Sequence, residues 1–280
     1  MRTVLEWAHH LLHAPTLTDK LTPCPAQASL GVWSADFQVP TNPGREARLL
    51  FSERQVKFPK LVSLSQDGPR ALALHSFANH EMLAIEMMAA ALLSYPHGEG
   101  DEGERWKRGL VAAIRDEQKH LALYVRRLRE SGADFGDFPL NDFFWRKMSE
   151  LKTPQSFFAT MSMTFEAANL DFALHYRDAF RAVGDEATAD ILQVVYDDEL
   201  SHVALGATWL GRWRGDRTLW DYYMSCLPFP LTPARSRGIG YRPEARREAQ
   251  IPEDWISALA AWEDPFRVTR RRGTHATHSG

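Results

Sequence analysis

Cysteine is scarce in this chain, and its two copies lie far apart. Cys24 and Cys226 stand in none of the spacings that are typical of structural zinc ligands. Two such distant residues do not build the disulfide framework of a small secreted domain, and they are compatible with a reducing compartment. The scarcity of cysteine therefore indicates neither a disulfide-stabilised protein nor a zinc–thiolate protein.

The chain also lacks a strong net charge and a long apolar run. Its formal net charge is −3 over 280 residues, too small to indicate a polyanionic partner such as nucleic acid. The most apolar window, Met82 to Leu93, contains Glu86 and is too short to span a bilayer. The N-terminal stretch has no uninterrupted apolar run of the kind found in signal peptides. We therefore expect a cytoplasmic protein that does not associate with membranes.

No segment shows a convincing strand-like alternation of apolar and polar residues, whereas helical periodicity is extensive. Apolar residues make up 44% of the chain, enough for a sizeable core. We predict an all-α protein whose long helices cover roughly 70–94, 104–132, 153–183 and 184–212. We expect an N-terminal helix and irregular arm over 1–69, a four-helix bundle over 70–212, and over 213–280 a C-terminal extension with a short helix near 252–262 and a disordered tail.

The same short motif, Asp-Glu-x-x-His, occurs on two of these predicted helices. Residues three apart lie on nearly the same helix face, so Glu117 with His120, and Glu199 with His202, can each present an oxygen and a nitrogen to one point. Both pairs lie on the apolar stripe of their helix, where a buried carboxylate needs a partner. Cations between the two helices would provide that partner, and a buried salt-bridge network is the alternative.

Two further glutamates complete the set of candidate metal ligands. Glu81 lies on the apolar stripe of the first long helix and Glu166 on that of the third. One Glu from each of two helices, with Glu-x-x-His from each of the other two, is the ligand set of the di-iron carboxylate four-helix bundles. Glu86 replaces Glu81 in this set if the register of the first helix differs from our prediction.

Three other residues are candidates for supporting roles. A metal-bound histidine needs an acceptor for its second ring N–H. We therefore predict a crosswise arrangement in which Asp116 holds His202 and Asp198 holds His120. Tyr124, one turn after His120, is either a redox residue or a core tyrosine.

The runs LHSFANHEMLAIEMMAAAL, RDEQKH, FEAANLD and DDELSHVALG resemble the ferritin-like superfamily, which includes bacterioferritins, rubrerythrins and di-iron oxygenases. The sequence is most similar to an uncharacterised bacterial branch akin to the di-iron tRNA-hydroxylating monooxygenases. The resemblance covers about residues 70–212 and implies a ferritin-like four-helix bundle that binds two metal ions. HEMLAIE is similar to the first-helix pattern of bacterioferritin-type proteins, which favours Glu81 over Glu86 as a ligand.

These observations lead us to expect a di-metal oxidase or oxygenase that activates O2, with two iron ions or with manganese in their place. Its substrate would be a small molecule or a modified nucleoside, an external donor would supply electrons, and a homodimer is one assembly that we consider. The alternatives are a ferroxidase or iron-storage protein, and a non-catalytic helical scaffold that binds metal for stability.

Overall fold

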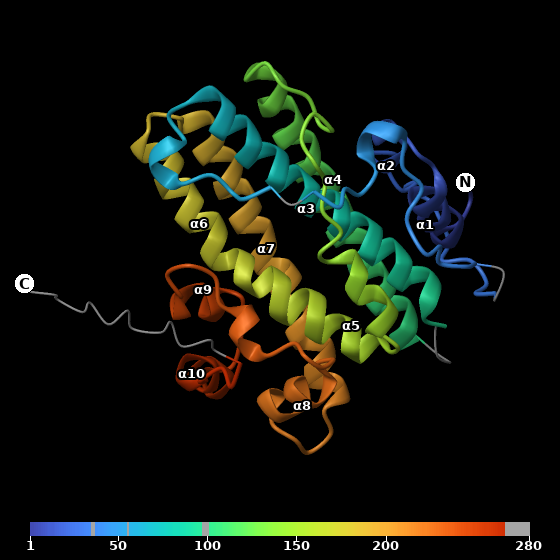
Figure 1. The fold of residues 1–280 in the computed structure, drawn as a ribbon. Coiled ribbons are helices and arrows are strands. Elements are labelled where there is room, and N and C mark those ends of the chain that lie inside the picture. The colour runs from blue at the N-terminus through green and yellow to red at the C-terminus, as the bar shows by residue number, and fades with distance from the viewer. Residues whose placement is uncertain (35–36, 55, 97–100, 267–280) are drawn as a thin grey trace, which may run out of the picture.

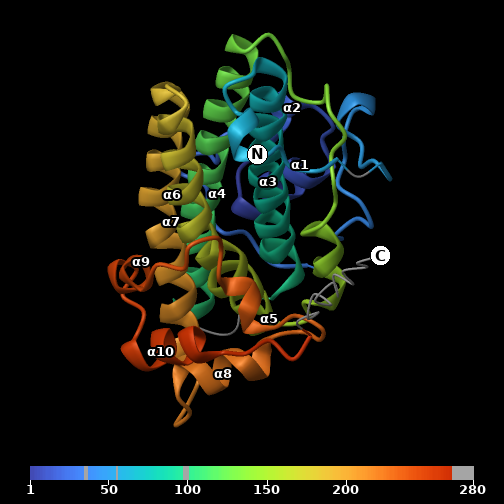
Figure 2. The same ribbon diagram turned by 60° about the vertical axis from the view of Figure 1, so that its left-hand side comes forward.

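The computed structural model describes residues 1–34, 37–54, 56–96 and 101–266. Four long helical segments lie side by side in it (Figures 1 and 2). They are α3 (Asp67–Ser94), α4 (Asp101–Glu130), the segment formed by α5 (Pro154–Thr160), η4 (Met161–Glu166) and α6 (Ala167–Ala182), and α7 (Glu186–Trp213). Helix α3 packs on α4, α6 packs on α7, and α4 packs on α7. The described residues contain isolated β-bridges but no strand, so the all-α prediction is confirmed for this part of the chain.

Local signals in the sequence explain where several helices begin and end. The Thr153 hydroxyl accepts from Ser156 N at 3.1 Å, and Pro154 occupies the first turn of α5. The Asp185 carboxylate accepts from Thr188 N at 3.0 Å and starts α7. Gly184, between α6 and α7, has a φ of 81°, a left-handed conformation that glycine adopts without steric strain. The helix–helix connection is therefore encoded by a glycine and a capping aspartate.

Helix α3 is buried around nearly its whole circumference along the central part of its length. It has α4 on one side and α1 (Val4–His13) on another. The N-terminal segment that covers it also contains α2 (Leu17–Lys20), η1 (Ala47–Leu49) and η2 (Leu61–Ser63). Because α3 is covered on several sides, apolar residues all round it are compatible with a folded core.

Glu86 shows how this N-terminal segment is fixed to α3. Its carboxylate is fully buried and lies 3.1 Å from Lys20 Nζ and 2.6 Å from Arg45 Nη2. The Lys20 ammonium also donates to Leu11 O at 2.7 Å. Glu86 thus has cationic partners supplied by the N-terminal segment. It does not lie with Glu81, the other candidate ligand on α3.

The C-terminal region is more helical than we predicted. The C-terminal extension, in which we predicted one short helix, contains α8 (Leu219–Cys226), η5 (Pro233–Ser236) and α9 (Pro243–Glu248), followed by α10 (Glu253–Ala261) close to the predicted short helix. Helices α8 and α9 were not predicted, because helices this short depend on tertiary packing, which sequence periodicity does not reveal. Here α8 packs on α5 and α7, and α9 packs on α6 (Figure 1). The tail that we predicted to be disordered lies outside the described residues.

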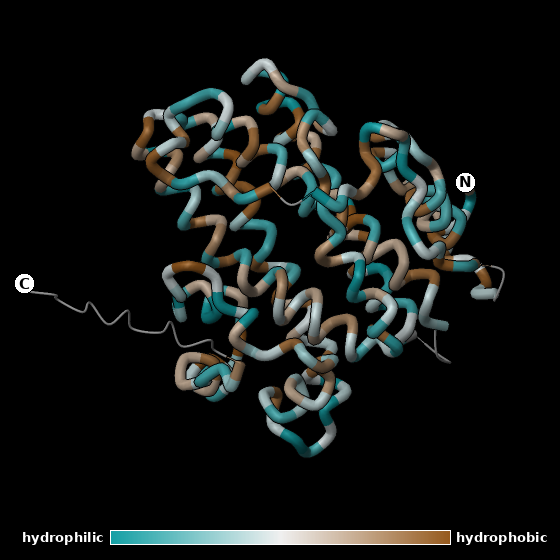
Figure 3. Tube along the Cα trace, viewed as in Figure 1, coloured by the Kyte–Doolittle hydropathy of each residue, from teal (hydrophilic) through white to brown (hydrophobic). Residues whose placement is uncertain are grey.

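Hydrophilic residues interrupt each of the long helices (Figure 3). Accordingly, no described helix combines the length and the hydropathy needed to cross a bilayer. The apolar residues of these helices instead form one continuous core between the four segments.

Candidate metal centre

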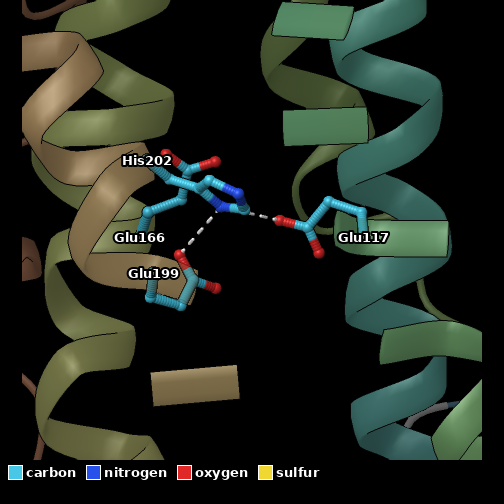
Figure 4. A group of neighbouring side chains, drawn as sticks. All are labelled: Glu117, Glu166, Glu199 and His202. Atoms are coloured by element: carbon cyan, nitrogen blue, oxygen red, sulfur yellow. Dashed lines mark ion pairs between the residues drawn. The ribbon is translucent and has the colours of Figure 1, made fainter. Parts of the chain in front are cut away.

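Six buried side chains from the four long segments converge in the middle of the helical core. They form two groups whose potential ligand atoms lie within 4.8 Å of one another. One group is Glu81, Glu117 and His120, and the other is Glu117, Glu166, Glu199 and His202, drawn in Figure 4. Glu117 belongs to both groups and therefore lies between two potential ion positions. The structure brings together all six residues that the sequence analysis selected.

The ring nitrogens that face this cluster are the Nδ1 atoms of both histidines. His202 Nδ1 lies 3.3 Å from Glu117 Oε1 and 3.4 Å from Glu199 Oε2. His120 Nδ1 lies 3.5 Å from Glu117 Oε2 and 3.8 Å from Glu81 Oε2. Each histidine therefore points one nitrogen at two carboxylates, as expected of side chains that share an ion.

The cluster has more hydrogen-bonding capacity than the protein satisfies. Among the described residues, eleven buried side-chain nitrogen or oxygen atoms lack a hydrogen-bond partner, and six of them belong to this cluster. These six are Glu117 Oε2, His120 Nδ1, both carboxylate oxygens of Glu166, Glu199 Oε2 and His202 Nδ1. Leaving such atoms unpaired costs about 1–3 kcal/mol each, so their concentration at one point indicates a missing partner.

No lysine or arginine in the described part of the chain forms an ion pair with these four glutamates. The contrast with other buried carboxylates is clear. Glu86 contacts Lys20 and Arg45, and fully buried Asp171 pairs with fully buried Arg246. Within the described residues, lysine and arginine therefore neutralise these structural carboxylates but not the central ones. This pattern fits a metal site better than the alternative of a buried salt-bridge network.

Burial and mutual contacts shift the pKa values of two cluster residues toward their protonated forms. Burial raises the pKa of Glu166 to about 8, and the neighbouring Glu199 and Glu117 contribute to that rise. Burial opposes protonation of His202, yet its contacts with Asp116, Glu117 and Glu199 raise its pKa well above the usual value. Metal ions bound by deprotonated carboxylates and neutral imidazoles would replace these protons. The oxygen and nitrogen donors of both groups could therefore bind metal.

Two aspartates contact the outer nitrogens of the histidines in the crosswise pairs that we predicted. His120 Nε2 lies 2.8 Å from Asp198 Oδ2, and His202 Nε2 lies 3.4 Å from Asp116 Oδ2. The Lys119 ammonium, missed by the sequence analysis, lies 2.5 Å from Asp198 Oδ2 and 3.4 Å from Asp116 Oδ1. An acceptor at Nε2 favours the tautomer that leaves the Nδ1 lone pair directed into the cluster.

Asn169 is a further residue that the sequence analysis missed. Its Nδ2 donates to Glu199 Oε1 at 2.8 Å and so restrains that carboxylate. The signal was present in the sequence, because Asn169 follows Glu166 by three residues and shares its helix face.

Glu166 is positioned by a π-helical turn that the sequence analysis did not predict. The turn, η4, ends at Glu166, and wider turns of this kind often occur at functional sites. Side chains satisfy backbone carbonyls in and before it. Thr164 Oγ1 donates to Ala159 O and Ser236 Oγ donates to Met163 O, each at 2.8 Å. Tyr223 Oη joins these two hydroxyls, at 2.8 Å from Thr164 Oγ1 and 2.6 Å from Ser236 Oγ. The C-terminal region therefore supports the turn that carries Glu166.

Tyr124 is fully buried and lines a cavity of ≈ 220 Å³ together with Glu81, Glu117, Glu166 and Glu199. Burial, and the nearby negative charge of Glu81, Glu199 and Glu117, raises the pKa of the Tyr124 phenol well above its usual value. The phenol is therefore protonated at neutral pH. Its position beside the cluster is compatible with both the redox role and the packing role that we considered.

The described residues define an all-helical protein with a buried cluster of carboxylates and imidazoles that could bind metal. The chain belongs to the family described as "Protein of unknown function (DUF455)", whose model matches residues 6–257. It is 26% identical over 170 residues to an "Uncharacterized protein" of Haemophilus influenzae, a match that covers 59% of this chain and 57% of that protein. No solved structure matches the chain.

Proposed function

We propose that this protein is an O2-activating di-metal oxidase or oxygenase built on a ferritin-like four-helix bundle, with iron or manganese as its metal. The observation that carries the proposal is the pair of buried donor groups that share Glu117 and line a cavity. Among the described residues, no lysine or arginine pairs with their carboxylates. The ferritin-like resemblance of the same four segments supports it.

The six donors divide into two ligand sets. Glu81, Glu117 and His120 would hold one ion, and Glu117, Glu166, Glu199 and His202 would hold the other. Bound there, two redox-active ions supply the electrons that O2 reduction requires at a protein site with open coordination positions. In an oxygenase reaction one oxygen atom enters a substrate C–H bond and the other leaves as water. An external reductant provides the two electrons, and two protons accompany them.

The surrounding residues hold the donors in place. Asp198 and Asp116 accept from the outer N–H groups of the histidines, and Asn169 restrains Glu199. Tyr124 places a protonated phenol at the same cavity and is our candidate for a redox residue. The aromatic lining of the cavity favours an organic substrate over the iron ions that a ferroxidase would admit.

Metal loading and O2 consumption test the proposal. We expect purified protein to bind two Fe(II) ions per chain under anaerobic conditions, one for each donor group. On mixing with O2 it should then consume O2 much faster than free Fe(II) and develop a charge-transfer absorption band. Glu117→Ala should lose both ions, because Glu117 serves both groups. Glu86→Gln, a change at an equally buried carboxylate outside the cluster, should retain them.

Iron retention separates an oxygenase from a ferroxidase. Repeated additions of Fe(II) and O2 should not build up a protein-bound ferric core, whereas a storage protein would accumulate one. Two results would contradict the proposal: metal binding that survives Glu117→Ala, or O2 consumption at the rate of free Fe(II).

A further inference from the structure

Two separate groups of aromatic rings line the cavity above the carboxylates. The first comes from the segment before η3 (Trp145–Glu150) and from the π-helical turn, and contains Phe143, Phe144 and Phe165. Phe144 stacks on Phe165 with ring centres 4.6 Å apart and lies 5.5 Å from Phe143. The second comes from α3 and α6. There Tyr176 lies 5.2 Å from Phe77 and stacks parallel to Phe172 at 6.3 Å.

Two arginines, Arg235 and Arg237, add positive charge to the same cavity. Arg235 is exposed to solvent, so it marks the place where the cavity opens. Its guanidinium lies 5.2 Å from the ring centre of Phe143, which is also partly exposed. Neither arginine forms an ion pair with a carboxylate within the described ranges, although Arg237 donates to two backbone oxygens, Trp262 O at 2.9 Å and Ala260 O at 3.5 Å.

The backbone between the two arginines is firmly held. Ser236 is fully buried, its hydroxyl donates to Met163 O at 2.8 Å, and its carbonyl accepts from Arg246 Nη2 at 2.7 Å. Arg246 in turn pairs with Asp171 on α6. Because Ser236 is fixed to both the π-helical turn and α6, Arg235 and Arg237 are presented to the cavity from a rigid element.

The chemical character of the cavity lining therefore changes from its buried part to its solvent-exposed part. The carboxylates that would bind metal are its buried part, aromatic rings line it, and the exposed Arg235 with the half-buried Arg237 adds positive charge toward the solvent side. Its volume of ≈ 220 Å³ is below the range of about 300–1,000 Å³ that is typical of sites for drug-sized ligands. Such a site suits a ligand of one or two rings, with apolar faces for the aromatic sides and an anionic group for the arginines.

We propose that the cavity binds a small planar aromatic anion, with its ring between the two aromatic groups and its anionic group on Arg235 and Arg237. The inference rests on the proposed function, because it assigns the class of substrate that would be oxidised. The ring would lie nearest the ligand cluster and the charge would lie farthest from it, so the orientation exposes a ring carbon to the oxidising centre.

Binding of defined probes to zinc-loaded protein tests this inference without turnover. By calorimetry, 2-naphthoate should bind at least about ten-fold more tightly than the neutral 2-naphthylmethanol, because it alone makes charge-assisted hydrogen bonds. It should also bind more tightly than cyclohexanecarboxylate, which has no aromatic face. Comparison of 2-naphthoate with 2-naphthyl phosphate shows whether carboxylate or phosphate is the preferred anion.

Variants localise the binding. Arg235→Gln should weaken 2-naphthoate binding about ten-fold or more and leave 2-naphthylmethanol binding nearly unchanged. Phe143→Leu, a change at a partly exposed ring, should weaken both naphthyl probes. Arg212→Gln is the matched control. Arg212 is also exposed and lies over an aromatic ring, Trp209, at 4.9 Å, but it does not line the cavity.

The inference fails if Arg235→Gln binds 2-naphthoate like the unaltered protein, if Arg212→Gln weakens it equally, or if charge makes no difference to the affinity. These results are distinguishable from failure of the proposed function. Intact O2 consumption without probe binding would overturn the substrate class alone. Arg235-dependent probe binding in a protein that takes up no iron would overturn the oxygenase and leave the anion site standing.

Discussion

His120 Nε2 lies 2.8 Å from Asp198 Oδ2, and through this contact α7 orients a candidate ligand that belongs to α4. The reciprocal contact, from His202 to Asp116, is longer at 3.4 Å. Each motif therefore supplies both a ligand pair and the acceptor for the other motif's histidine. These two reciprocal hydrogen bonds couple the relative positions of α4 and α7 to the geometry of the site.

Asp198→Asn should lower the affinity for Fe(II) about 10–100-fold, because the amide is a weaker acceptor for the histidine N–H. Asp116→Asn should have a smaller effect, since its contact is longer. Competition with a chelator measures both affinities. Asp197→Asn provides the control, because Asp197 accepts from Gln193 on the same helix and not from a histidine of the cluster. Equal affinities of the Asp197 and Asp198 variants would argue against the orienting role.

The two donor groups predict different metal stoichiometries for single substitutions. Glu81→Ala removes a donor from only the group with His120, and Glu166→Ala removes one from only the group with His202. Each variant should therefore retain one tightly bound ion, whereas the Glu117 variant retains none. Elemental analysis after gel filtration checks this. Loss of both ions in the Glu81 variant would show that the two positions cannot be filled independently.

Glu86→Gln should destabilise the protein by about 3–5 kcal/mol, because it leaves Lys20 and Arg45 as buried charges without a carboxylate. Its iron content should not change. Glu81→Gln should show the opposite pattern, with less bound iron and little loss of stability in the metal-free protein. Urea denaturation of the metal-free variants, with metal analysis alongside, separates the two glutamates. A drop in bound iron for Glu86→Gln would contradict the assignment.

Gly206 allows α7 to approach the π-helical turn closely. A Cβ atom at this position would lie 2.4 Å from Ser162 Cβ, which belongs to a short and inflexible side chain. Gly206→Ala should therefore cost about 1–3 kcal/mol of stability and weaken metal binding by displacing Glu166. Gly211→Ala on the same helix meets nothing within 4 Å and should be neutral or stabilising by up to about 1 kcal/mol. Thermal unfolding of both variants tests the contrast.

His75 makes stability depend on pH. Burial lowers its pKa to about 4, and the neutral ring accepts from Gly136 N at 3.0 Å. Between pH 4 and the unfolded value near 6.5, the unfolded chain binds more protons at His75 than the folded protein does. Stability therefore rises with pH across this window and is lost as pH falls through it, by about 3 kcal/mol in total.

His75→Gln removes this titration but can still accept a hydrogen bond. The difference in unfolding free energy between the variant and the unaltered protein should therefore shift in favour of the variant as the pH falls from 7 to 5. Urea denaturation in the presence of EDTA measures it without metal. A difference that does not vary with pH would show that His75 is protonated equally in both states.

Much of the helical core could be predicted because its signals are local. The periodicity of residues 70–94 and the Thr153–Pro154 start both correspond to observed helices. The π-helical turn could not be predicted, because its carbonyls are satisfied partly by Ser236, which lies 73 residues from Met163 in the chain. Helices α8 and α9 were missed for a related reason, since they are too short to be stable without the surfaces on which they pack.

The choice between Glu81 and Glu86 also depended on contacts between distant segments and not on local signals. Five residues at 3.6 per turn place these two glutamates about 140° apart on α3, so helix geometry alone established only that they face different neighbours. The neighbours decided the outcome: Lys20 and Arg45 reach Glu86, whereas Glu117 and His120 of α4 lie beside Glu81.

By itself the sequence determined that carboxylates and imidazoles share helix faces, because a spacing of three residues is enough to place them there. Only the tertiary structure decided that the faces meet around Glu117, that Asn169 restrains Glu199, and that aromatic rings and two arginines surround the approach. The physical reason is that a helix repeats over a few residues, whereas a site depends on contacts between segments that only the packed core brings together.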